Sequence, residues 1–159
     1  MSDIFNQIHR LSKQGEYDRA LDLLLDKSGG RINAPYDEDL NHAWYVAGDL
    51  YHKKGDFQTA AKAFDKAVAD RPDDPEALLA LANCYFELEM PGVAERYLRI
   101  ALRHSDDIGL IYNLGNALFD QGRYDEALVE YRRVPPDAGE IYEMAQRNIA
   151  VARERLADQ

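Results

Sequence analysis

The chain has 159 residues, of which 46% are hydrophobic, and its 29 acidic and 19 basic residues give a net charge of -10. This charge argues against nucleic acid as a partner, because phosphate-backbone binding needs a basic surface. The single cysteine, Cys84, excludes an internal disulfide framework and a cysteine-based zinc site. The first residues contain no basic cluster followed by an apolar run, and no apolar run is long enough to cross a bilayer. We therefore expect a cytoplasmic protein without membrane insertion.

The first part of the chain predicts two short helices. Ile4, Ile8 and Leu11 share one helical face, and Gly15 stands at a break before a second apolar stretch with helical spacing. Residues 28–39 are rich in Ser, Gly, Asn, Asp and Pro, which favour turns. We expect this loop to leave the first helix pair packed less regularly than the pairs that follow.

The stretch from Trp44 to Pro72 predicts a pair of helices joined by a tight turn. Four apolar or small residues fall at i, i+3, i+4 and i+7 on one helical face: Trp44, Ala47, Gly48 and Tyr51. After the break at Gly55 and Asp56, a second apolar face is formed by Phe57, Ala60, Phe64 and Ala67. Gly55 can take the left-handed conformation that ends a helix, and Asp56 can cap the next one. Gly48 and Ala60 have almost no side chain, so the two helices can cross closely there.

The same arrangement recurs twice along the chain. The small residues Ala60 and Ala94 are 34 positions apart, and Ala94 and Ala127 are 33 apart. The second copy differs at its internal turn, where residues 89–92 (Glu-Met-Pro-Gly) replace the usual glycine and aromatic residue. Two prolines at 135–136 end the third copy, and residues 139–157 predict one further helix.

This order of residues resembles the tetratricopeptide repeat, whose period is 34 residues. The resemblance implies an all-α fold, a right-handed superhelical stack of antiparallel helix pairs. It divides the single domain 1–159 into a degenerate repeat at 1–30, regular repeats at 41–74, 75–107 and 108–137, and a capping helix at 139–157. It also implies a scaffold or adaptor that binds other proteins and needs no cofactor.

The first helices of stacked repeats line the concave side of such a superhelix, so residues off their packing faces are the candidate binding residues. They form one stripe at i, i+4 and i+7 in each helix: Tyr45, Asp49, His52, Leu79, Asn83, Phe86, Tyr112, Asn116 and Phe119. An asparagine side chain offers a donor and an acceptor to the amide groups of a peptide, and aromatic rings supply apolar contact area. We therefore expect the groove to bind an extended or helical peptide segment.

The charges near this stripe indicate the character of the partner. Some tetratricopeptide proteins hold the acidic tail of cytosolic chaperones with Lys, Asn and Arg, but neither register of this chain places Lys or Arg at the clamp positions. Asp49, Glu76, Glu87 and Asp120 lie near the inner face instead. We expect a neutral to basic, partly apolar partner segment rather than an acidic chaperone tail.

Two alternative functions stay open. Residues 82–105 resemble the small acidic tetratricopeptide chaperones of type III secretion translocators, and end repeats that dock on a second copy would give a self-assembling scaffold. An enzyme or a metalloprotein is not indicated. The sequence contains no HExxH motif, no histidine pair at i, i+4, no nucleophile–base pair and no phosphate loop. We therefore expect no catalytic, cofactor-binding or metal-binding residues.

Overall fold

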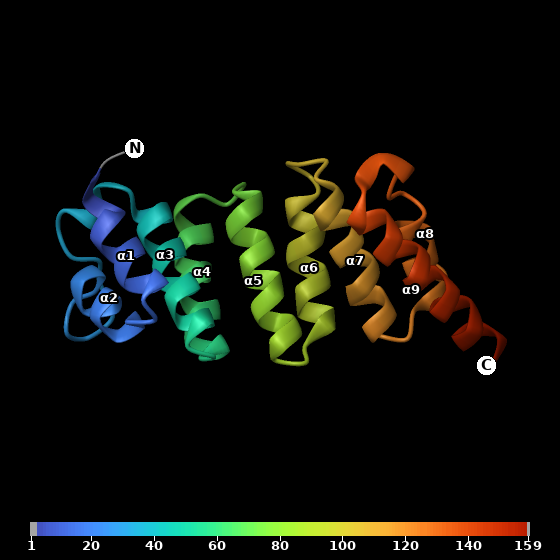
Figure 1. The fold of residues 1–159 in the computed structure, drawn as a ribbon, viewed down its shortest axis with the longest axis horizontal. Coiled ribbons are helices and arrows are strands. Elements are labelled where there is room, and N and C mark those ends of the chain that lie inside the picture. Colours follow the sequence, from blue (N-terminus) through green and yellow to red (C-terminus); the bar gives the residue numbers. More distant parts are fainter. Residues whose placement is uncertain (1–2, 159) are drawn as a thin grey trace.

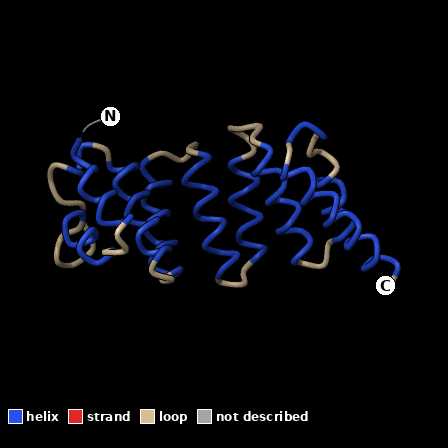
Figure 2. Tube along the Cα trace, viewed as in Figure 1, coloured by secondary structure: helices blue, strands red, loops and turns tan. Residues whose placement is uncertain are grey.

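Helices follow one another in a single row from one end of the molecule to the other (Figure 1). The computed structural model describes residues 3–158, and this part of the chain contains nine α-helices and no β-strand (Figure 2). The all-α helical-repeat solenoid predicted from the sequence is confirmed. The α-helices are α1 (Asn6–Lys13), α2 (Tyr17–Leu24), α3 (Leu40–Lys53), α4 (Phe57–Asp70), α5 (Pro75–Glu87), α6 (Pro91–Ala101), α7 (Ile108–Asp120), α8 (Tyr124–Tyr131) and α9 (Glu140–Ala157). Three 3-10 helices, η1 (Asp3–Phe5), η2 (Tyr36–Glu38) and η3 (Pro136–Ala138), precede α1, α3 and α9.

Aspartate side chains begin four of these helices. Each accepts a hydrogen bond from a backbone N–H of the first helical turn. The four residues are Asp39 for α3, Asp56 for α4, Asp74 for α5 and Asp107 for α7. These bonds satisfy amide groups that have no partner inside the helix, and the negative charge is favourable at a helix N-terminus. The helix starts are therefore determined locally by the sequence.

A residue in the left-handed region stands at the turn inside each of the three central helix pairs. Gly55 has φ 81° and Gly122 has φ 73°, a conformation that glycine adopts without steric cost. In the middle pair the same place is taken by Glu89, with φ 57°. A residue with a Cβ is destabilised by about 1–2 kcal/mol in this conformation. Glu89, which stands where the other two pairs have glycine, therefore strains the turn, although the turn still forms.

The small residues predicted at the helix crossings allow close contact there. A Cβ built on Gly48 would lie 2.6 Å from Cε1 of Phe64, and one built on Gly115 would lie 2.5 Å from Cε1 of Tyr131. Both glycines, and the alanines at 60, 82, 94 and 127, are buried. In these two pairs the aromatic ring of the second helix therefore rests directly on the backbone of the first helix, and the predicted close crossing is confirmed.

The segment between α2 and α3 is held by its own contacts. Asn33 donates side-chain hydrogen bonds to the carbonyl oxygens of Leu23, at 3.1 Å, and Leu25, at 2.7 Å. Tyr36 is buried, with its ring centroid 5.1 Å from that of Phe5. These two anchors hold the loop against α2 and η1, and the looser packing expected of the first helix pair stays a prediction.

A carboxylate with little solvent exposure connects α6 to the turn between α7 and α8. Glu95 accepts hydrogen bonds from Arg99 at 2.8 Å, from Gln121 at 2.9 Å and from Arg123 at 2.6 Å. Burial alone would raise the pKa of Glu95, but these hydrogen bonds and the charges of the two arginines outweigh it and lower the pKa. The ionised carboxylate therefore stabilises the packing of two neighbouring helix pairs.

The hydrophobic core runs along the whole stack rather than around one centre. One cluster of buried residues joins η1 to α5, a second includes α4 and α5, and a third extends from α5 to α9. Each helix pair thus buries its apolar face against its neighbours, as repeat proteins do. No helix within residues 3–158 is both long enough and apolar enough to traverse a bilayer.

Candidate functional site

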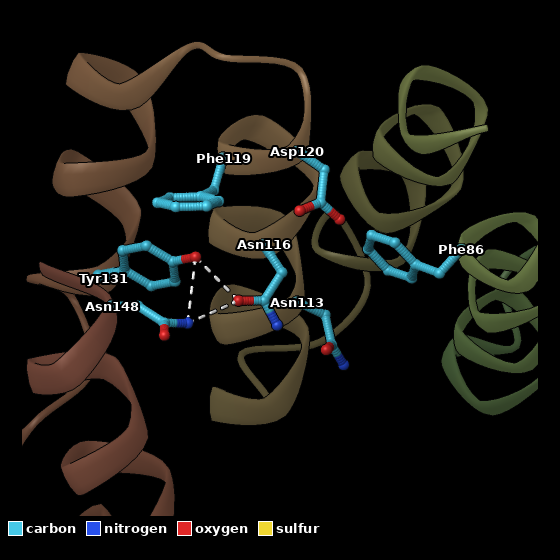
Figure 3. A pocket seen from close by; sticks show the side chains of 7 residues that line it. All are labelled: Phe86, Asn113, Asn116, Phe119, Asp120, Tyr131 and Asn148. Atoms are coloured by element: carbon cyan, nitrogen blue, oxygen red, sulfur yellow. Dashed lines mark hydrogen bonds between the residues drawn. The ribbon is translucent and has the colours of Figure 1, made fainter. Parts of the chain in front are cut away.

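A pocket of about 330 Å³ opens near the C-terminal end of the stack (Figure 3). It lies beside α5 and α7, which are the first helices of the second and third regular repeats. Its walls come from α5 and from the three consecutive helices α7, α8 and α9. Seven side chains line it: Phe86, Asn113, Asn116, Phe119, Asp120, Tyr131 and Asn148. Three of them, Phe86, Asn116 and Phe119, belong to the stripe predicted from the sequence.

A hydrogen-bond network forms one side of the pocket and ties α9 to α7 and α8. The Tyr131 hydroxyl donates to Oδ1 of Asn116 at 2.8 Å, and Nδ2 of Asn148 donates to the same oxygen at 3.1 Å (Figure 3). The Asn148 amide also lies 3.3 Å from the Tyr131 hydroxyl and 3.2 Å from that of Tyr112. Burial raises the pKa of Tyr131, so its hydroxyl stays protonated and available as a donor.

This network changes the role expected of Asn116. Its carbonyl oxygen is occupied by Tyr131 and Asn148, so only its Nδ2 group is left to offer to a ligand. Asn113, one helical turn earlier on α7, makes no side-chain hydrogen bond within the described part of the chain and points into the same pocket (Figure 3). Asn113 is therefore the residue on α7 with both a free donor and a free acceptor.

Two phenylalanine rings and one carboxylate form the rest of the pocket. Phe119 is fixed by an edge-to-face contact with Tyr124, with centroids 5.0 Å apart, and Phe86 approaches from α5 on the other side (Figure 3). Asp120 stands at the rim between them. Partial burial raises the pKa of Asp120, although the side chain also reaches solvent.

The predicted residues on α3 lie outside this pocket and are engaged with their own neighbours. Tyr45 packs edge-on against Phe64 with centroids 5.5 Å apart, and Asp49 pairs with Lys53 at 2.7 Å. His52 makes an edge contact with a ring of α4, centroids 5.0 Å apart. Burial raises the pKa of Tyr45, and the nearby carboxylates at 76, 49 and 74 add to that shift. This part of the inner face is therefore acidic.

The remaining three predicted residues occupy different places. Leu79 lines a second hollow of about 420 Å³ together with Leu110 and carboxylates at the N-terminal ends of α5 and α7. Asn83 is exposed, and its side chain makes no hydrogen bond to any residue in the range 3–158. Tyr112 packs against Tyr131, with ring centroids 5.9 Å apart. The peptide-binding role of all nine residues stays a prediction.

Four pocket residues were not on the predicted stripe. Asn113 and Asp120 lie on α7 beside Asn116 and Phe119, so a wider stripe along that helix would have included them. Tyr131 and Asn148 come from α8 and α9. A polar residue next to the inward face of the last helix is the signal for Asn148, but its partners depend on how α9 packs.

Neither metal binding nor a reactive thiol is evident in the described part of the chain. No three His, Cys, Asp or Glu side chains of residues 3–158 are grouped so that they could hold a metal ion. Cys84 is fully buried, and burial, with a small contribution from Glu87, raises its pKa to about 12. The thiol is therefore protonated at neutral pH and belongs to the core.

Comparison with known proteins gives one family and several related structures. Residues 53–134, just over half of the chain, match the family model described as "Anaphase-promoting complex, cyclosome, subunit 3". The chain is 31% identical over 93 residues to protein FlbA of Caulobacter vibrioides, and the match covers 58% of this chain. It spans 16% of the length of the curated relatives that it matches.

Solved structures share this arrangement of helices over most of the chain. YrrB, described as a tetratricopeptide protein with an unusual peptide-binding site, is 26% identical, with a TM-score of 0.77 over 98% of this chain and 77% of its own. The first tetratricopeptide domain of Spaghetti (RPAP3), solved with the HSP90 peptide SRMEEVD, is 20% identical, with a TM-score of 0.68 over 85% of this chain and 98% of its own. The latter likeness shows the fold alone.

Proposed function

Because the chain belongs to the tetratricopeptide-repeat family that the subunit 3 model describes, we propose that it is a non-catalytic interaction module. Its concave groove holds an extended or helical segment of a partner protein. The observation that carries this proposal is the pocket in which the unpaired amide of Asn113 lies beside the rings of Phe86 and Phe119. Such a surface combines adaptable hydrogen bonding with apolar area.

The asparagines supply the contacts that do not depend on the partner's sequence. The side chains of Asn83 and Asn113 have free donors and acceptors, and Asn116 keeps one free NH₂ group. An amide side chain can pair with both the N–H and the C=O of a peptide unit. Apolar side chains of the partner would then enter between Phe86 and Phe119.

The related structures support peptide binding, but the pocket of this chain favours a peptide of different charge from the one bound by RPAP3. YrrB has a peptide-binding site, and the RPAP3 domain holds the acidic peptide SRMEEVD. In this chain the pocket contains the carboxylate of Asp120 and no basic side chain among its lining residues. An acidic segment would be repelled there, so we propose a neutral to basic, partly apolar segment as the ligand.

A random peptide library displayed on phage tests the proposal. We expect peptides selected on the wild-type chain to bind the Asn83→Ala/Asn113→Ala variant about tenfold or more weakly, because each lost hydrogen bond is worth about 1 kcal/mol. The melting temperature should stay within about 2 °C, since neither side chain makes a bond within the fold. Gln14→Ala, an exposed amide at the end of α1, is the matched control.

Equal binding by the double variant and the wild type would refute the groove. Asn116→Ala is unsuitable for this test, because it also removes a bond that holds α9.

The secretion-chaperone and self-assembly alternatives stay predictions, to be tested by co-purification of one apolar translocator and by light scattering at several concentrations. The cytoplasmic location expected from the sequence also remains a prediction.

A further inference from the structure

The carboxylate of Asp120 is held in an unfavourable place. Asp120 is the last residue of α7, where the carbonyl groups of the helix end create a negative potential. Its side chain receives no hydrogen bond and forms no ion pair with any other described residue, and partial burial raises its pKa. Two effects, the helix terminus and partial burial, therefore act against the negative charge of this solvent-exposed side chain, and no described residue offers it a partner.

The surroundings of Asp120 are suited to a flat cation. The rings of Phe86 and Phe119 flank it, and the amide oxygen of Asn113 lies below in the same pocket (Figure 3). Aromatic faces attract cations, and a guanidinium group stacks on them while it donates to a carboxylate. The volume of about 330 Å³ is ample for one such side chain.

We propose that this pocket receives an arginine side chain of the bound segment, whose guanidinium group pairs with Asp120 between Phe86 and Phe119. The inference rests on the proposed function and names the chemistry of its ligand. The partner is thus a protein segment that carries a basic residue where it passes between α5 and α7.

Charge complementarity over a wider area supports the same occupant. The chain carries a net charge of -10, and the carboxylates around Tyr45 make the α3 end of the inner face acidic as well. Asp49 in that region is already paired with Lys53, whereas Asp120 is not paired. A basic segment lying along the groove would therefore find an unpaired carboxylate at Asp120.

The first experiment examines the pocket without a peptide. N-acetyl-L-arginine amide is titrated into the ¹⁵N-labelled chain, with N-acetyl-L-citrulline amide as the uncharged control of nearly the same shape. We expect arginine to shift the side-chain amide signals of Asn113 and Asn116 in a saturable way, and citrulline to leave them in place. The Asp120→Asn variant should lose the response to arginine. Equal responses to the two amides, or no response to either, would overturn the inference.

The second experiment uses the peptides selected on the wild-type chain and separates this inference from the groove itself. Replacing the arginine they share by citrulline should weaken binding to the wild type about five- to tenfold, the sum expected of an exposed ion pair and a cation–π contact. The same replacement should change binding to Asp120→Asn less than about twofold. Peptides that depend on Asn83 and Asn113 but tolerate citrulline would refute the arginine site and leave the proposed function standing. If no peptide depends on the asparagines, the proposed function fails as well.

Discussion

The hydroxyl of Tyr131 provides a direct test of how α9 is held on the stack. Tyr131→Phe keeps the ring that packs against Gly115 and removes two hydrogen bonds, the one donated to Asn116 and the one accepted from Asn148. A neutral hydrogen bond contributes about 1 kcal/mol net, so the loss should be about 1–2 kcal/mol. In a chain of this length that lowers the melting temperature by about 2–8 °C.

A double-mutant cycle with Asn148→Ala distinguishes a network from independent contacts. Both side chains donate to the same oxygen of Asn116 and lie 3.3 Å from each other. The double variant should therefore lose less than the sum of the single losses, by about 0.5–1 kcal/mol. Urea unfolding followed by circular dichroism and by fluorescence of the single tryptophan, Trp44, measures the three values and tests whether the transition is two-state.

Tyr142→Phe on α9 is the matched control, because the structure gives that hydroxyl no hydrogen bond to any described residue, and we expect it to leave stability unchanged. The reasoning would be refuted by an unchanged stability of Tyr131→Phe. Losses that add fully in the double variant would show that the bonds do not act as a network.

Three further variants test the helix pairs themselves. Gly115→Ala should lower the melting temperature, because overpacking against Tyr131 costs about 1–3 kcal/mol and the gain in helix propensity is at most about 1 kcal/mol. The control is Gly92→Ala, whose Cβ would meet nothing closer than 3.5 Å and which should not lower the melting temperature. Glu89→Gly should raise the melting temperature by about 2–4 °C in thermal unfolding, because it relieves a left-handed backbone; an unchanged value would show that the turn is not strained. Glu95→Gln should cost about 0.5–1 kcal/mol at pH 7. The pKa of Glu95 is lowered on folding from its usual 4.5, so its contribution is complete above that pH and is lost as the pH falls through the folded-state pKa; at lower pH the variant and the wild type should converge in urea unfolding.

The sequence determined the repeat architecture because its signals are local and recur. Aspartates at 56, 74 and 107 start helices, glycines at 55 and 122 end them, and residues without bulk recur at intervals of 33–34 positions where helices cross. Each of these features acts within one helix pair or between adjacent pairs. A single repeat unit therefore contains most of the information needed to predict the fold.

The composition of the pocket depended on contacts between helices far apart in sequence. The stripe on α7 predicted Asn116 as a ligand-binding group with a free donor and acceptor, but α8 and α9 bring Tyr131 and Asn148 onto its oxygen. That outcome depends on the angle at which α9 packs after the two prolines, which no local pattern specifies. The same packing leaves Asn113 unpaired and leaves Asp120 exposed at the pocket rim between two rings. The repeat pattern alone thus places side chains on the inner face, whereas tertiary packing decides which of their polar groups are already satisfied and which are left for a partner.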